Sequence, residues 1–415
     1  MTTDGADAHK AVEEAARAAR GTVADLAGVP GERLDQALRA IADGLVRSSA
    51  PVLAANEEDM AAAAEAGLGG GLLDRLRLDE GRLASIADQL RALAGVPYEP
   101  AERAVRELPS GLLLAERRRP VGVIGANFEA RPNVAVDVAG QLLKSLNGAV
   151  LRTGGAALGT VTVLVDEVLR PALAEAGLPP EVVGLVRTPD REGARVLVSL
   201  PQVLPLVILR GSGETTAELA REAAQHGVRT LAHAEGGGVL YIGPDADADM
   251  AEALVEASLD RLGVCNRLNL LLLDRASESQ LPRLRALLDR LGIGVREPER
   301  LGHEWANDPE HISSVTLRVV ASLEEAVSLA NDETSGLAAA IVTGDATVAD
   351  RFLSTYRGTA AYWNTTTRFT DGFALTGSPE TGINVDRVPG PRGPVTYRDL
   401  WLRQYRVTGD GTQHR

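Results

Sequence analysis

Residues 121–153 read VGVIGANFEARPNVAVDVAGQLLKSLNGAVLRT, and this stretch decides the fold. The short apolar run 121–125 predicts a buried strand, residues 133–146 predict a helix, and residues 149–152 predict a second strand. Strands that alternate with helices favour a doubly wound parallel sheet, in which ligands bind at the carboxyl ends of the strands. We therefore expect an α/β fold with a ligand site beside this stretch.

The same alternation extends along most of the chain. Further helices are expected near 160–176, 191–200 and 214–225, with strands at 183–187 and 204–209. After residue 238 the alternation resumes, which predicts a second α/β domain. Its strands are expected at 239–242, 268–273, 315–320, 339–343 and 359–363, and its helices at 248–262, 281–291, 323–331 and 348–355.

The remaining segments carry other signals. Residues 5–64 and 72–93 have apolar positions at helical spacing and predict packing helices. Alternating residues in 103–120, around the turn sequence Pro-Ser-Gly at 109–111, predict a β-arm that reaches a neighbouring subunit. The tail from Gly372 is rich in Gly and Pro, and its aromatic end predicts docking on a partner. Arm and tail together predict a homodimer or a higher homo-oligomer.

Composition narrows the class of protein. With 43 Lys+Arg against 57 Asp+Glu, the formal net charge of −14 disfavours nucleic acid and anionic membranes as partners. The longest apolar runs, such as 204–209, are far shorter than the roughly 20 residues that span a bilayer. No signal peptide is visible in residues 1–19, and a single cysteine excludes internal disulfides. The histidines lack metal-binding spacing, so we expect no metal site. The missing signal peptide and the lack of disulfides favour a cytoplasmic protein.

Cys265 is the only thiol in the chain. It lies between the predicted helix 248–262 and the predicted strand 268–273, and therefore on a loop. A lone cysteine is commonly a small buried apolar residue. Placement on a loop favours the alternative, a reactive nucleophile.

Gly211-Ser212-Gly213 lies where the predicted strand 204–209 turns into a helix. Backbone N–H groups at a glycine turn and a helix N-terminus can hold a phosphate or a pyrophosphate. The full GxGxxG pattern is absent, because its third glycine position is Thr216. A tight strand-to-helix turn without a ligand explains the local sequence equally well.

Five motifs occur in a fixed order: FEARPNV at 128–134, LKS at 143–145, VCN at 264–266, Asn364 with TRFTDG at 367–372, and GPRG at 390–393. With them the chain resembles the gamma-glutamyl phosphate reductase family of the aldehyde dehydrogenase superfamily over nearly its whole length. The resemblance implies an aldehyde dehydrogenase-like fold, with two doubly wound α/β domains, a β-arm and a C-terminal oligomerisation element. It implies a cofactor-binding domain at 1–103 and 120–236, a catalytic domain at 237–378, and an oligomerisation arm and tail at 104–119 and 379–415.

The resemblance also implies a chemistry. In this family a cysteine thiolate attacks an acyl phosphate, phosphate leaves, and the thioester accepts a hydride from NADPH, so NADP is the expected cofactor. Cys265 is the candidate nucleophile. The backbone N–H of Cys265 and the amide of Asn133 are candidate donors to the oxyanion. For Asn133 the alternative is an N-cap of the following helix.

Binding residues follow from the same motifs. Arg131 and Arg368 can each present a planar fork to phosphate or carboxylate, although a lone arginine is usually a solvated charge. The resemblance implies a substrate site of Arg131, Asn266, Asn364, Arg368, Phe369 and Thr370, and a cofactor site of Arg152, Gly211, Ser212 and Gly213. His233 and Glu235 are interpreted as wall residues, because a reductase needs no base to activate water.

Several positions depart from the family pattern and remove polar groups from the expected substrate site: Gly238, Val239, Asn269, Leu337 and 373–378. Three functions remain open. The leading one is NADPH-dependent reduction of L-glutamyl 5-phosphate to L-glutamate 5-semialdehyde for proline biosynthesis. The second is a paralogue of specialised metabolism that reduces a modified or carrier-bound glutamyl-type acyl phosphate. The third is a catalytically silent scaffold on the same fold.

Overall fold

A computed structural model describes residues 3–211, 213–233, 236–262, 264–301, 313–386 and 390–414. The chain forms two compact units, which are described one at a time. Unit 1 contains residues 1–231, 378–381 and 395–415, and unit 2 contains residues 232–377 and 382–394. The expected domain limit at 236/237 lies near the boundary of the units. Residues 382–394, which we expected in the tail, pack with unit 2.

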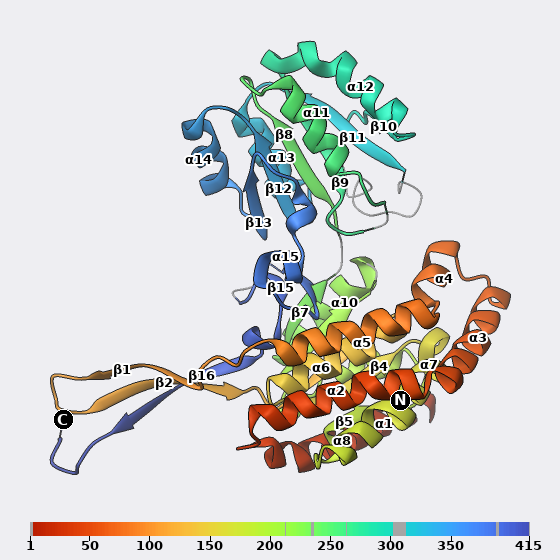
Figure 1. The fold of residues 1–415 in the computed structure, drawn as a ribbon, viewed down its shortest axis with the longest axis vertical. Helices are drawn as coiled ribbons and strands as arrows, with labels where there is room; N and C mark the ends of the chain where they lie inside the picture. Colours follow the sequence, from red (N-terminus) through yellow and green to blue (C-terminus); the bar gives the residue numbers. More distant parts are fainter. Residues whose placement is uncertain are drawn as a thin grey trace. The chain divides into compact units, whose positions relative to one another are not determined.

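A parallel sheet forms the centre of unit 1, with the strand order β5-β4-β3-β6-β7 (Figure 1). Strands β4 and β5 lie on one side of β3, and β6 and β7 lie on the other. Right-handed crossovers in these two directions place helices on both faces of the sheet. The doubly wound sheet predicted from residues 121–153 is therefore confirmed. The strands are β3 (Val123–Phe128), β4 (Gly148–Thr153), β5 (Val183–Leu185), β6 (Leu206–Arg210) and β7 (Arg229–His233).

Helix α6 (Pro132–Lys144) links β3 to β4. Pro132 begins it, because its fixed φ suits the first helical position. Leu146, with φ of 61°, turns the chain just after its end. The other helices of unit 1 are α1 (Thr3–Thr22), α2 (Gly31–Arg47), α3 (Ser49–Glu65), α4 (Gly70–Leu76), α5 (Glu80–Gly95), α7 (Leu158–Val163), α8 (Arg170–Glu175), α9 (Glu192–Leu197) and α10 (Gly213–His226).

Two helices occupy the segment 72–93, where the periodicity predicted one helical stretch. Helix α4 ends at Leu76, and α5 begins at Glu80. Asp79 caps α5, because its side chain accepts a hydrogen bond of 2.7 Å from the Arg82 N–H. The apolar spacing continues across the break, so periodicity alone does not show it.

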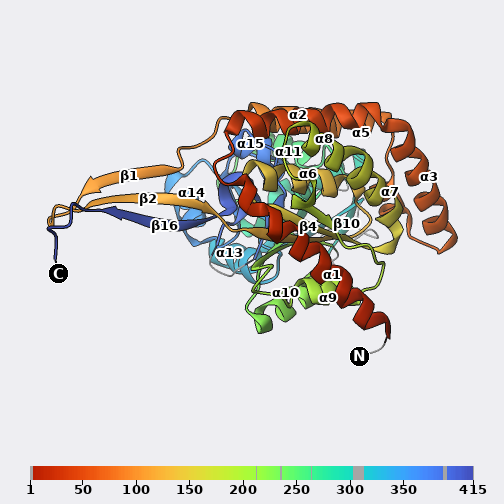
Figure 2. The ribbon, with the colours of Figure 1, turned by 90° about the horizontal axis from the view of Figure 1, so that it is seen from below.

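A three-stranded antiparallel arm extends from unit 1, as Figures 1 and 2 show. Strands β1 (Glu102–Glu107) and β2 (Leu113–Pro120) form the predicted hairpin, and Gly111 takes a left-handed φ of 80° in its turn. The third strand, β16 (Trp401–Thr408), pairs with the whole of β2. The C-terminal end of the chain therefore completes the arm.

The tail docks on its own chain before it enters the arm. Buried Gln141 of α6 holds two segments, since its Nε2 donates to Pro379 O at 2.5 Å and its Oε1 accepts from Tyr397 N at 2.7 Å. Asn147 donates to Leu400 O at 2.8 Å. The tail, which we expected to dock on a partner, thus docks on unit 1 of its own chain.

Unit 2 has a six-stranded sheet in the order β10-β11-β9-β8-β12-β13. Its paired strands are parallel, and the central ones are buried along their whole length between two apolar clusters. The strands are β8 (Gly238–Ile242), β9 (Leu268–Asp274), β10 (Gly294–Arg296), β11 (Ser314–Val320), β12 (Ala338–Val342) and β13 (Ala360–Trp363). The helices are α11 (Ala248–Ala257), α12 (Leu281–Arg290), α13 (Leu323–Asp332), α14 (Ala346–Thr355) and α15 (Gly372–Thr376), and β14 (Gly382–Asn384) pairs with β15 (Gly393–Val395).

Within the described part of the chain, none of the helices is both long and apolar enough to cross a membrane.

Candidate active site

Cys265 lies on a turn directly before β9, at the amino edge of the sheet of unit 2. It is half-buried rather than sealed in the core. The neighbouring strand fixes the turn, because Gly237 N donates to Cys265 O at 2.6 Å and Gly238 N donates to Arg267 O at 2.7 Å. The predicted loop placement of the thiol is confirmed.

Gly236 allows the backbone to approach this thiol closely. A Cβ atom at residue 236 would lie 2.6 Å from Cys265 Cα and 2.7 Å from Cys265 Cβ. Such distances do not occur in real contacts, so a side chain here would displace the nucleophile. The sequence signal was the glycine run 236–238, which did not by itself point to the cysteine.

The motif after β13 folds back onto the residue beside the thiol. Asn266 is buried, and its Nδ2 donates to the backbone oxygens of Arg368 and Thr370, each at 3.0 Å. Arg368 donates to Asn266 Oδ1 and pairs with Asp260 at 2.6 Å. Thr370 is fully buried, with its hydroxyl 3.0 Å from that of Tyr362. The structure thus brings three of the predicted substrate residues next to Cys265, and it uses much of their hydrogen bonding to hold the loop.

Phe369 and Asn364 are placed differently. Phe369 is on the same loop and half exposed. Asn364 lies at the other edge of the sheet, where its Oδ1 accepts from Thr343 N at 3.1 Å and its Nδ2 donates to Thr343 O at 3.0 Å. These bonds stabilise a left-handed φ of 51°. The structure does not bring Asn364 to the thiol, and its role in substrate binding stays a prediction.

In unit 1, Asn133 and Arg131 lie at the beginning of α6, at the carboxyl end of β3. The N-cap of α6 is Arg131, whose side chain makes no capping hydrogen bond. Asn133 is therefore not the N-cap, which removes the alternative considered for it. Its Nδ2 instead donates to Asp137 Oδ2 at 3.1 Å, one helical turn further on.

Asp137 is a residue that the sequence reasoning missed. The residue as a whole is half-buried, and protein groups surround its carboxyl. Desolvation raises its pKa to about 7, with Glu380 adding to the shift, while the charge of Arg210 and the Asn133 hydrogen bond oppose it. The spacing of four residues from Asn133 was the available signal, because residues so spaced lie on one face of a helix.

The cofactor residues lie at the carboxyl edge of the sheet of unit 1. Gly211 follows β6 at the point where the strand order reverses, and α10 begins at Gly213. Open α/β sheets bind nucleotides at this point. Ser212 falls outside the described residues.

Arg152 is buried at the end of β4, and its guanidinium faces inward. It donates to Asn127 Oδ1 at 3.1 Å and to Asp190 O at 2.7 Å, and burial lowers its pKa. Two buried polar atoms at this strand end, Arg152 Nε and Thr153 Oγ1, have no hydrogen-bond partner among the described residues. Such orphaned atoms fit a polar ligand at this edge, such as the ribose or phosphate of a dinucleotide.

The positions that depart from the family pattern lie mainly in the core of unit 2. Val239 and Leu337 are fully buried, and a Cβ at Gly238 would lie 2.3 Å from Thr367 Oγ1. Packing therefore explains the apolar residues there. His233 Nδ1 accepts from Ile383 N at 2.8 Å, which fits the expected wall role, whereas Glu235 lies outside the described residues.

Unit 1 has the strand order of a dinucleotide-binding sheet, and unit 2 is an α/β domain that presents a single accessible thiol. Together these features are typical of a dehydrogenase-type oxidoreductase. Residues 2–298 and 314–393 match the aldehyde dehydrogenase family, and the chain belongs to that family. Aldehyde dehydrogenases use nicotinamide cofactors.

Individual relatives give a more specific comparison than the family match does. A gamma-glutamyl phosphate reductase of Clavibacter michiganensis subsp. michiganensis is 38% identical over 96% of this chain and 94% of its own length. The enzyme of the same name from Thermobifida fusca is 34% identical over 98% and 99%. The crystal structure of gamma-glutamyl phosphate reductase from Thermotoga maritima superposes with a TM-score of 0.90, at 27% identity over 97% of this chain and 100% of that chain.

More distant structures share the fold. An acetylating aldehyde dehydrogenase from Geobacillus thermoglucosidasius gives a TM-score of 0.73 at 15% identity, over 100% of both chains. The predicted aldehyde dehydrogenase-like fold is therefore confirmed, and the chain is an aldehyde dehydrogenase-type oxidoreductase that acts on a small molecule.

Proposed function

We propose that this protein reduces L-glutamyl 5-phosphate to L-glutamate 5-semialdehyde and phosphate with NADPH, as a cytoplasmic enzyme of proline biosynthesis. The observation that carries the proposal is the half-buried Cys265 on a turn fixed by Gly236–Gly238, in a chain whose relatives carry the name of this reductase.

The reaction proceeds in two steps. The Cys265 thiolate attacks the acyl carbon, the bond from that carbon to the phosphate oxygen breaks, and phosphate departs with the electron pair. A reduced nicotinamide held by the proposed cofactor residues would supply a hydride to the thioester carbon in the second step. The carbon–sulfur bond to Cys265 would then break, releasing the aldehyde and restoring the thiolate.

The protein's own groups have separate tasks. The Cys265 backbone N–H and the Asn133 amide stabilise the oxyanion that forms in each step. Arg131 and Arg368 bind the anionic substrate, and Asn266, Phe369, Thr370 and Asn364 complete the proposed substrate site. Gly211, Ser212 and Gly213 hold the nucleotide phosphates, while Arg152 shapes this edge through the loop at Asp190.

The reverse reaction offers a direct test. Purified protein is given L-glutamate 5-semialdehyde, phosphate and NADP+, and NADPH formation is followed by absorbance. We expect turnover that depends on phosphate, exceeds the rate with NAD+, and is abolished in Cys265→Ala. Turnover that persists in Cys265→Ala would rule out the thioester route.

One observation favours a second candidate, the reduction of a modified or carrier-bound glutamyl-type acyl phosphate. Phe369, Phe373 and Leu375 are each about half exposed on and just after the loop that Asn266 holds. A small polar substrate needs no such apolar surface. Slow turnover of the free semialdehyde, restored when the acyl group is presented on a carrier, would favour this candidate over the first.

We also propose that the protein is a homo-oligomer assembled through the arm. Val105, Leu113, Leu402, Tyr405 and Val407 are apolar arm residues with about half or more of their surface exposed. Apolar side chains exposed on both faces of an extended sheet are typical of an association surface.

A further inference from the structure

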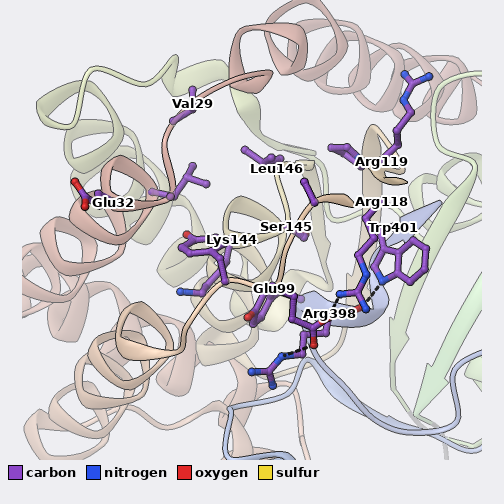
Figure 3. Close-up of a pocket in the computed structure, with 16 residues that line it drawn as sticks. Val29, Glu32, Glu99, Arg118, Arg119, Lys144, Ser145, Leu146, Arg398 and Trp401 are labelled. Carbon is purple, nitrogen blue, oxygen red and sulfur yellow. Dashed lines mark hydrogen bonds and ion pairs between the residues drawn. The ribbon is translucent and has the colours of Figure 1, made fainter. Parts of the chain in front are cut away.

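A pocket of about 460 Å3 lies in unit 1 at the root of the arm (Figure 3). Five separate segments line it: 29–34, 98–101, 118–120, 144–146 and 397–401. The residues assigned above to the thiol, the substrate and the cofactor do not line it. Its volume lies in the range typical of sites for small organic molecules.

Lys144 forms the floor of this pocket. It is one of two lysines in the chain, and its side chain is 0% exposed. The ammonium lies 2.8 Å from Asp35 Oδ1, 4.1 Å from the centre of the Tyr98 ring and 5.5 Å from that of Tyr397. The rings of Tyr98 and Tyr397, which form an aromatic wall of the pocket, therefore lie beside a buried positive charge.

Arginines occupy the opposite wall. Arg118 and Arg398 both pair with Glu99, and Arg118 also stacks over the ring of Trp401 at 4.6 Å, as Figure 3 shows. The two oxygens of Glu99 are thus shared between two guanidinium groups. Arg118 Nε is buried and has no hydrogen-bond partner among the described residues. A donor that the protein leaves unsatisfied points to an additional acceptor.

The charge of the pocket contrasts with that of the protein. Four cationic side chains, Arg118, Arg119, Lys144 and Arg398, line it against the two acids Glu32 and Glu99. Asp35 pairs with Lys144 from behind, which leaves one positive charge in excess in a chain of net charge −14. A local positive potential of this kind attracts small anions.

We propose that this pocket binds a small monocarboxylate with an apolar or aromatic body. The single excess charge matches a singly charged group, and the guanidinium forks of Arg118 and Arg398 match the geometry of a carboxylate. The rings of Tyr98 and Trp401 provide surfaces on which an apolar body can pack. The proposal is independent of the reaction proposed for Cys265.

Calorimetric titration of the full-length protein with phenylacetate, phenylacetamide and inorganic phosphate tests this site. For a ligand of this size we expect phenylacetate to bind with a Kd of about 1 mM or tighter. Phenylacetamide is expected to bind about tenfold more weakly, because it lacks the charge. Phosphate should bind more weakly than phenylacetate, because it offers nothing to the aromatic wall.

Single-residue variants test whether phenylacetate binds in this pocket. Arg118→Gln is expected to weaken phenylacetate binding about tenfold, and Arg119→Gln, an exposed position that does not risk the fold, about threefold. Arg103→Gln is the matched control, since Arg103 pairs with Glu116 on the arm outside the pocket. Arg103→Gln and Cys265→Ala should both bind phenylacetate like the unmodified protein.

The proposal would be overturned by no heat of binding up to 10 mM phenylacetate, by equal affinity for phenylacetamide, or by unchanged affinity in both Arg118→Gln and Arg119→Gln. Loss of binding in Cys265→Ala with retention in the arginine variants would place the ligand elsewhere and would equally overturn it.

Discussion

Asn133 Nδ2 donates a hydrogen bond of 3.1 Å to Asp137 Oδ2, across one turn of α6. The bond fixes the orientation of the Asn133 amide, because the amide must keep its nitrogen toward the carboxylate. It also links the proposed oxyanion donor to a carboxyl that titrates near neutral pH, with a pKa of about 7.

Asp137 makes stability depend on pH. The pKa of its carboxyl is about 7 in the folded protein and about 3.9 in an unfolded chain. Between these values the folded state binds more protons than the unfolded state, so stability falls as pH rises from about 4 to 7 and then levels. Asp137→Asn should remove this component of the slope. Urea unfolding at pH 5 and pH 8 measures it, and an identical slope in both proteins would contradict the assignment.

The pH dependence of kcat should also follow the ionisation of the Asp137 carboxyl. Below pH 7 the protonated carboxyl accepts the Asn133 hydrogen bond more weakly than the carboxylate does, so we expect kcat to fall in acid with an apparent pKa near 7. In Asp137→Asn, kcat at pH 8 should fall about tenfold with KM little changed, because an oxyanion donor acts mainly in the transition state. The pH profile should also lose the ionisation near 7. A profile that keeps it would show that Asp137 only fills space.

Gly236→Ala should inactivate the protein without unfolding it. The added methyl group would lie 2.6 Å from Cys265 Cα, so the turn that carries the thiol must move. We expect kcat/KM to fall at least about 100-fold, because a misplacement of about 1 Å has this effect on a positioned nucleophile. Gly294→Ala is the control in the same unit, since its nearest neighbour, Ser314 Cβ, is at an ordinary 3.6 Å. Equal activity of the two variants would contradict the argument.

The Lys144–Asp35 pair should behave as a buried ion pair. Lys144→Met leaves Asp35, which is only 16% exposed, without its cation, and we expect a loss of about 3–5 kcal/mol in the free energy of unfolding. The double variant Lys144→Met with Asp35→Asn should recover part of this loss, because no uncompensated charge remains. Urea unfolding of the single and double variants provides the comparison. A double variant less stable than Lys144→Met would refute the pairing.

The arm should control assembly. Tyr405 and Val407 are 56% and 52% exposed on β16, and alternation places them on one face of the strand. Changing both to Asp should shift the protein toward the monomer in light scattering coupled to size-exclusion chromatography. Gln225→Glu adds charge at an exposed position of α10, outside the arm, and serves as the control. An unchanged mass in the double variant would exclude this surface as the interface.

Much of the fold could be predicted because its signals are local. The apolar strands around 121–153 and the turn at Gly111 are encoded within a few residues of where they act. The pairing of β16 with β2 was not predictable in this way, because it joins residues almost 300 positions apart. Strand β7 was missed because it has only five residues and begins with the polar pair Arg229-Thr230.

The candidate site likewise contains some residues that local sequence can place and others that it cannot. Cys265 could be placed on a loop from its flanking elements alone. The inward guanidinium of Arg152 and the position of Asn364 at the far sheet edge depend on packing between distant segments, which a motif does not record. Gly236 matters only because the turn before β9 brings the thiol against it.

We propose that the acyl group passes through a thioester on Cys265. Incubating the protein with L-glutamate 5-semialdehyde and NADP+ in the absence of phosphate should trap this intermediate, because its acceptor is missing. Mass spectrometry of proteolytic fragments should then show one glutamyl group on the peptide that contains Cys265, and added phosphate should remove it. An enzyme that turns over with phosphate yet never carries an acyl group on Cys265 would contradict the account.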